Sequence, residues 1–295
     1  MEASPVRNRL MLAAAALLFS TGGAAIKAAT LTAWQVASFR SAVAAVFLIV
    51  ALPEARRGWR WRIVPAALAY AATLVLFVLA NRLTTAANAI FLQDTAPLYV
   101  ALLGPWLLRE PLRRSDVIYV LAVAGGMLLF FVGAPPAAAT APDPVRGNWI
   151  GVASGLTWAL TITGLRWLGR GSGGNAAMAT VALGNLIAAV VALPMALPAP
   201  VAGATNVAVV LYLGVVQIGL AYVFVTRAIR QVLAFEAAAV LLLEPALNPV
   251  WAWVVHGEKP GTWPVAGGAV ILLATLVNTW RQADRPQAEA RPSRS

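Results

Sequence analysis

Apolar runs of about twenty residues follow one another along almost the whole chain, and they restrict what it can fold into. A helix needs about 20 apolar residues to cross the hydrocarbon core of a bilayer. We expect ten such helices, at residues 10–29, 32–52, 63–81, 84–107, 116–133, 148–167, 176–197, 205–226, 232–255 and 263–280. The sequence is 60% hydrophobic and 11% charged, whereas a soluble domain carries about 25% charged residues. The sequence therefore predicts an all-α polytopic membrane protein, because lipid must be the solvent for most of its surface.

A segment near the middle of the chain returns in altered form near its end. Residues 97–110 read PLYVALLGPWLLRE, and residues 245–258 read PALNPVWAWVVHGE. The prolines that begin the two segments and the glutamates that end them are both 148 residues apart, so the segments align without a gap. Such self-similarity predicts two structural copies, 1–140 and 141–281, with five helices each. Because five is an odd number of crossings, we expect the second copy to be inverted relative to the first, around a central cavity.

The basic residues predict which way the helices cross the membrane. Seventeen of the 22 Lys and Arg residues fall in segments that are cytoplasmic if the N-terminus is inside, and four fall at outer ends or loops. This asymmetry predicts that both termini are cytoplasmic. The net charge of +11 is therefore interpreted as a topology signal, and we expect no nucleic acid as a partner. The polar tail, residues 282–295, is predicted to be cytoplasmic and disordered.

The residue types argue against several kinds of chemistry. The chain has no cysteine and a single histidine, His256, so we expect neither a disulfide nor a Cys/His zinc site. The sequence contains no Walker motif, which argues against ATP hydrolysis by this chain. We therefore expect no metal, no cofactor and no enzymatic activity. An intramembrane enzyme and a membrane scaffold without transport activity are the remote alternatives.

Two proline–glutamate pairs bound the repeated segments, Pro97 with Glu110 and Pro245 with Glu258. Together with the ten predicted spans and Arg40 inside the second span, they resemble the EamA family of the drug/metabolite transporter superfamily. The resemblance covers spans one to ten, and the aromatic content of the spans is similar to that of the aromatic amino-acid exporters in this family. It implies an inner-membrane exporter of small metabolites, with a basket of helices around a cavity lined mostly by the first four spans of each half.

Charged groups inside the spans are the first candidates for a binding site, because each costs about 2.5–3.5 kcal/mol at the bilayer centre on insertion scales. Arg40, Asp94 and Glu244 fall near the middle of their spans, and Glu236 falls nearer the cytoplasmic end of its own. We expect these groups to line the cavity; the alternatives are a structural ion pair for Arg40 and support of a helix break for Glu244. At an interval of 148 residues Glu236 corresponds to Asn88, whereas Asp94 and Glu244 have apolar counterparts. The charged site is therefore predicted to be asymmetric.

Aromatic rings and prolines supply the remaining candidates. Four rings within the spans are predicted to lie near the cavity: Tyr70, Tyr99, Trp158 and Tyr222. Such rings stack on planar substrates or hold an ammonium group, and packing against helices or lipid is the alternative. Pro97, Pro245 and Pro249 remove backbone donors inside spans, so we expect them to form either hinges or fixed bends.

The leading hypothesis is a secondary transporter that exports a small amphipathic metabolite, such as an aromatic amino acid, by alternating access. Carboxylates would bind the ammonium group of this substrate, and Arg40 or a helix N-terminus would bind its carboxylate. Protons are a second candidate partner, and the sequence does not distinguish proton coupling from facilitated diffusion or exchange. The alternative is a multidrug or organic-cation exporter, which the intramembrane acids favour and Arg40 in the cavity disfavours. The sequence leaves open whether the protein is a monomer or a homodimer.

Overall fold

The computed structural model of the chain describes residues 5–107, 114–132, 137–169, 175–199, 203–228, 232, 237 and 240–283. Within these ranges the secondary structure is helical, apart from one isolated bridge between Ala138 and Ala141. Seven of the described helical segments are long and apolar enough to cross a membrane, and Val117–Val132 is a shorter apolar helix. The expected fold class, an all-α polytopic membrane protein, is confirmed, and the division into two inverted halves stays a prediction.

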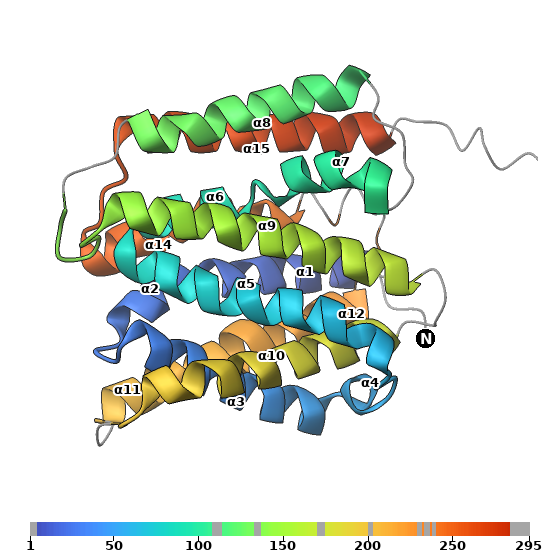
Figure 1. Cartoon of the computed structure of the whole chain (residues 1–295), viewed down its shortest axis with the longest axis vertical. Coiled ribbons are helices and arrows are strands. Elements are labelled where there is room, and N and C mark those ends of the chain that lie inside the picture. Colours follow the sequence, from blue (N-terminus) through green and yellow to red (C-terminus); the bar gives the residue numbers. More distant parts are fainter. Residues whose placement is uncertain are drawn as a thin grey trace, which may run out of the picture.

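The helices run in broadly the same direction, side by side (Figure 1). The first part of the chain forms α1 (Pro5–Ser20), α2 (Gly22–Ala28), α3 (Ala33–Ala51), α4 (Pro53–Arg56), η1 (Trp61–Ile63), α5 (Val64–Leu83), α6 (Ala86–Gln93), α7 (Ala96–Leu107) and α8 (Arg114–Val132). The second part forms α9 (Pro144–Gly169), α10 (Asn175–Ala196), α11 (Ala204–Leu211), the π-helix η2 (Tyr212–Leu220), α12 (Ala221–Ala228), α14 (Leu243–His256) and α15 (Thr262–Ala283). Helix α15 extends two residues into the predicted tail, and residues 284–295 lie outside the described residues.

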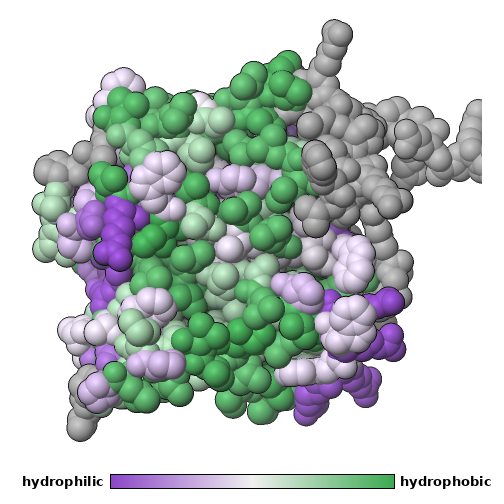
Figure 2. Space-filling view, viewed as in Figure 1, coloured by the Kyte–Doolittle hydropathy of each residue, from purple (hydrophilic) through white to green (hydrophobic). Residues whose placement is uncertain are grey.

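The outer surface has the polarity that a bilayer requires. Figure 2 shows an apolar band across the middle of one face, with hydrophilic residues gathered at its left and right edges. Large apolar side chains are widely exposed on the helices, among them Val50 at 70%, Leu121 at 66% and Leu273 at 62%. An apolar surface of this extent is unfavourable in water, so the band faces lipid.

Helices from the two parts of the chain pack against each other reciprocally: a contact between two helices of different parts has a matching contact in which the parts are interchanged. Helix α5 packs against α9, and α1 packs in turn against η2 and α12. Helices α6 and α7 pack against α9, and α14 packs against α1 and α2. In two further pairs, α3 with α10 and α8 with α15, each helix packs against the helix at the corresponding position of the other part. Helices α8 and α15 lie together at one edge (Figure 1). Two related five-helix units would produce this pattern.

Two of the predicted spans are broken near the middle. A turn at Asp94 and Thr95 separates α6 from α7, and a turn at Leu242 directly precedes α14. The turns at Asp94 and Leu242 are 148 residues apart, the same interval that separates Pro97 from Pro245. Both prolines lie in the first turn of a helix, where the missing N–H removes no helical hydrogen bond. They therefore begin helices instead of bending them, whereas Pro249 lies inside α14.

Glycines set the distance between α8 and α15, and they give a first testable prediction. A Cβ atom on Gly267 would lie 2.5 Å from the backbone oxygen of Gly126, whereas one on Gly125 meets nothing within 4 Å. Both substitutions to alanine gain the same helix propensity, so their difference isolates the steric clash. We expect Gly267→Ala to be less stable than Gly125→Ala by about 1–3 kcal/mol, the usual cost of overpacking. Thermal unfolding in detergent measures this, and equal midpoints for the two variants would contradict the packing.

Candidate functional site

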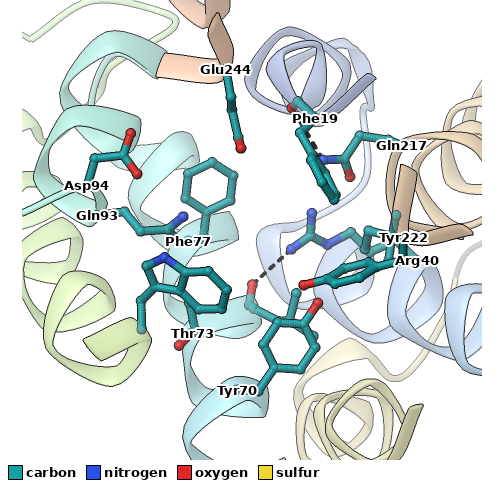
Figure 3. A pocket seen from close by; sticks show the side chains of 13 residues that line it. Phe19, Arg40, Tyr70, Thr73, Phe77, Gln93, Asp94, Gln217, Tyr222 and Glu244 are labelled. Atoms are coloured by element: carbon teal, nitrogen blue, oxygen red, sulfur yellow. Dashed lines mark hydrogen bonds between the residues drawn. The ribbon is translucent and has the colours of Figure 1, made fainter. Parts of the chain in front are cut away.

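A cavity with a volume of about 120 Å³ lies among the helices. Its lining comes from α1, α3, α5, α6, α9, η2, α12 and α14, and from the turn that separates α6 from α7. Arg40, Tyr70 and Trp158 each lie in the middle part of a long helix, which places the cavity near the middle of the helix bundle. It contains charged, aromatic and amide side chains, as Figure 3 shows.

Arg40 supplies the positive charge of the cavity. Its side chain is buried, with 1% of the residue exposed, and its Nη2 donates to the backbone oxygen of Leu74 at 3.0 Å. Its Nε has no hydrogen-bond partner. Among the described residues no carboxylate lies within ion-pair distance of Arg40. A salt bridge between Lys27 and Glu258 lies elsewhere, outside the cavity. The guanidinium is thus held in place by one backbone oxygen, and a further donor remains for a ligand.

Asp94 and Glu244 supply the acids, and both lie at helix breaks. Asp94 caps the C-terminal end of α6, and Glu244 lies in the first turn of α14, where the helix dipole favours a negative charge. Both residues are half-buried, and Oδ2 of Asp94 has no hydrogen-bond partner. Figure 3 shows both carboxyl groups directed toward the space beside Phe77, across the cavity from Arg40. The broken helices therefore bring together two acids, each of which corresponds to an apolar residue in the other half.

Aromatic rings form a continuous wall of the cavity. The rings of Tyr70 and Trp158 have centroids 6.2 Å apart, and those of Tyr70 and Tyr222 are 6.3 Å apart in an edge-to-face arrangement. Phe19 extends this wall, with its ring centroid 5.4 Å from that of Tyr222. Rings in these arrangements present both faces and edges to a ligand, so they can contact a planar apolar group or a cation.

The cavity contains residues that we did not predict from the sequence. Gln93 and Gln217 line it, and Gln217 donates to the backbone oxygen of Phe19 at 3.4 Å. Both glutamines are polar residues inside predicted spans, so the criterion used for the charged residues would have found them. Phe19 and Phe77 also line the cavity, and no signal separates them from the other phenylalanines in the spans.

Two of the predicted residues that the structure describes do not line the cavity. Asn88 is buried in a structural network, where its Nδ2 donates to Oδ1 of Asn148 at 2.9 Å. The hydroxyl of Tyr99 lies 3.9 Å from Sδ of Met127 on α8. Glu236 lies outside the described residues. The structure brings together the six others: Arg40, Tyr70, Asp94, Trp158, Tyr222 and Glu244.

A second charged cluster lies outside the cavity, around the repeated residue Glu258. Its Oε2 lies 2.9 Å from Nζ of Lys27, and both side chains are buried. Its Oε1 accepts from the backbone N–H of Ala86 at 2.6 Å, at the start of α6. Lys27 also donates to the backbone oxygens of Thr84, at 2.9 Å, and Thr140. This cluster holds α2, α6 and the segment after α14 together, whereas Glu110 in the first copy lies outside the described residues.

Comparisons with known proteins place these features in context. The EamA-like transporter family matches this chain twice, at residues 9–132 and at residues 145–280. A protein of Archaeoglobus fulgidus, described as an uncharacterized transporter, is 27% identical over 214 residues, which cover 69% of this chain and 70% of its own. A crystal structure with 20% sequence identity matches 94% of this chain and 99% of its own, with a TM-score of 0.62. At that identity the likeness shows the fold alone.

Proposed function

The chain belongs to the EamA-like transporter family and is a multi-pass membrane transporter, and from this premise we propose that it exports small zwitterions. Amino acids with aromatic or bulky apolar side chains are the proposed substrates. One observation carries the proposal: Arg40 lies on one side of an aromatic-walled cavity, and Asp94 and Glu244 lie on the other (Figure 3). A zwitterion presents the complementary pair of groups, a carboxylate and an ammonium.

Each group of such a substrate has a partner in the cavity. The planar guanidinium of Arg40 can bind a carboxylate through two parallel hydrogen bonds, and its contact with Leu74 fixes its position. Asp94 and Glu244 can accept from the ammonium group. The wall of Tyr70, Trp158 and Tyr222 can pack against an aromatic or aliphatic side chain. The cavity thus matches a substrate with two opposite charges and one apolar arm.

We further propose that the substrate moves by alternating access between two inverted halves, residues 1–140 and 141–281. The broken helices at Asp94 and Leu242 support this, because transporters with inverted repeats bind substrates near the bilayer midplane at discontinuous helices. The reciprocal packing of the helices supports it as well. The distribution of basic residues supports an orientation with both termini in the cytoplasm, in the inner membrane.

Protons are the second proposed partner. A carboxyl group of Asp94 or Glu244 binds either a proton or the ammonium group of the substrate, and the two compete for the same oxygens. This competition would exchange protons for substrate across the membrane. Facilitated diffusion without protons is the alternative, and the experiment below separates the two by means of an imposed pH gradient.

An organic-cation exporter is the second candidate function. The two acids and the aromatic wall favour it, because both attract cations. Arg40 disfavours it, since a buried guanidinium in the same cavity repels a cation that has no carboxylate. The charge pattern therefore supports zwitterions over cations as substrates.

Transport by the purified protein in proteoliposomes tests the proposal. We expect saturable uptake of labelled tryptophan or leucine at least about tenfold above that of protein-free vesicles, a ratio equal to about 1.4 kcal/mol. Tryptamine, which lacks the carboxylate, is the matched comparison and should move more slowly than tryptophan. Uptake that responds to a pH gradient at constant membrane potential would support proton exchange. Transport of tryptamine without tryptophan would favour the cation exporter, and no flux of either class would overturn the proposal.

A further inference from the structure

The short helix α2 separates the cavity from one end of the molecule. The side chain of Gln217, which lines the cavity, packs so closely against α2 that a Cβ atom on Gly22 would lie 2.9 Å from its Nε2. Helix α2 also contacts α5, α6 and α14, so elements from both parts of the chain surround it. It ends at Ala28, before the turn into α3, at the end of the molecule far from the N-terminus (Figure 1). A substrate leaving the cavity toward that end has to pass α2.

Two buried amides face α2 without a full set of hydrogen bonds. Asn248 on α14 is 0% exposed, and neither its Oδ1 nor its Nδ2 has a partner. Asn81 on α5 is also 0% exposed; its Nδ2 donates to Phe77, and its Oδ1 has no partner. A Cβ atom on Gly23 would lie 2.5 Å from Oδ1 of Asn248 and 3.0 Å from Oδ1 of Asn81. Both amide oxygens are therefore directed at the same point of α2.

Buried polar atoms without partners are unusual and unfavourable, because they lose their hydrogen bonds to water. Here they lie between the cavity and the end of the molecule that α2 covers. They would be satisfied if α2 moved away and admitted water or a polar ligand. The arrangement is therefore unfavourable in the closed conformation and favourable in an open one.

We infer that Asn81 and Asn248 form a second polar binding site for the substrate, on its path from the cavity to the outer face. The inference rests on the proposed function and extends it. Carboxamides offer both donors and acceptors, so they can bind the ammonium and the carboxylate of a zwitterion in turn. They carry no charge and bind these groups less strongly than Arg40 and the acids do, which suits a site that a substrate leaves quickly.

Helix α2 packs through apolar residues such as Ile26, which is fully buried in the hydrophobic core, and a set of polar contacts also fixes its position. A turn at Thr21 separates α2 from α1, and the Thr21 hydroxyl bonds with Tyr212 at 2.8 Å. Farther along α2, Nε2 of His256 lies 2.8 Å from the backbone oxygen of Ala24. Near the C-terminal end of α2, Lys27 pairs with Glu258. The Lys27–Glu258 pair therefore stabilises the closed position of α2 over Asn248.

Replacement of Asn248 by leucine, which has a similar size, separates this site from a structural role. We expect a higher thermal midpoint, because two unpartnered buried polar atoms are removed. We also expect the maximum rate of tryptophan transport to fall by about tenfold, because the open state and the bound substrate lose hydrogen-bond partners worth about 1.4 kcal/mol. Asn278→Leu on the peripheral helix α15 is the control and should transport normally. An unchanged rate in Asn248→Leu would overturn the inference.

The absence of cysteine from the chain allows a second, direct test. In Asn248→Cys the new thiol should react with a membrane-impermeant thiol reagent added from the outer side. The reaction should be about tenfold faster when Lys27→Met/Glu258→Leu removes the closing pair, since about 1.4 kcal/mol changes an equilibrium tenfold. A cysteine at Ala182, buried in the core on α10, is the control for general unfolding and should stay protected. Protection of both cysteines in vesicles that transport tryptophan would overturn the second site and leave the proposed function standing. Vesicles that transport nothing would overturn the proposed function instead.

Discussion

Substitution of Arg40 by methionine should strongly reduce the transport of tryptophan and leave the transport of tryptamine intact or faster. The guanidinium is the one positive group that lines the cavity among the described residues, so its loss removes the proposed partner of the substrate carboxylate. A hydrogen bond to a charged group contributes about 1.5–3 kcal/mol, which corresponds to a decrease in transport efficiency of about 10- to 100-fold. Tryptamine has no carboxylate to lose, and it gains from the removal of a repelling charge. The ratio of the two initial uptake rates measures the effect.

Two further measurements secure this interpretation. Arg40→Lys keeps the charge but not the planar fork, so it should restore only part of the tryptophan transport. Thermal unfolding should show that Arg40→Met folds normally, because methionine can fill the space of the arginine stem and a buried charge without an acidic partner is removed. Equal losses of tryptophan and tryptamine transport in a stable Arg40→Met protein would contradict the assignment of Arg40 to the carboxylate.

The charged part of the site could be predicted from the sequence because a charge inside an apolar run needs a reason. The position of Arg40, Asp94 and Glu244 within predicted spans marks them as candidates, and the structure places all three in one cavity. The spans themselves are visible as apolar runs because a charged residue in lipid is costly, so few charges interrupt them. The physical cost of a charge in lipid thus makes both the fold and part of the site visible in the sequence.

Asn88 and Tyr99 show where this reasoning stops. Both residues fall in one predicted span, 84–107, but a turn at Asp94 and Thr95 divides that segment into α6 and α7. Facing relations within a helix depend on a constant rotation of about 100° per residue, and a turn ends that relation. In the structure Asn88 bonds with Asn148, and Tyr99 reaches toward α8. The sequence contained Pro97, but a proline alone does not show whether it bends a helix or begins a new one.

The role of Glu258 also depended on tertiary structure. The sequence marked it as the last residue of a repeated segment, and nothing in the segment indicated its partners. In the structure it pairs with Lys27, which is far away in the sequence, and caps the start of α6 at Ala86. A repeated residue can thus be structural, and the residues in which the copies differ, such as Asp94, line the cavity.

Glu258→Gln should therefore be among the most destabilising single substitutions in this protein. The change leaves the ammonium of Lys27 buried without an opposite charge, and breaking a buried pair from one side costs about 3–5 kcal/mol of the free energy of unfolding. The glutamine oxygen can still accept from Ala86, so the loss arises mainly from the ion pair. Unfolding by a denaturing detergent, followed by tryptophan fluorescence, measures the difference.

Removal of both charges should be much less harmful than removal of one. In Lys27→Met/Glu258→Leu no buried charge is left without a partner, and apolar replacements of a buried pair are often neutral or stabilising. We therefore expect the double variant to recover most of the stability that Glu258→Gln loses, although α6 loses its cap. The same double variant cannot re-form the closing contact between α2 and the segment after α14, so its outer side should stay more open than that of the unchanged protein. A double variant as unstable as Glu258→Gln would contradict the assignment of that loss to the unpaired charge of Lys27.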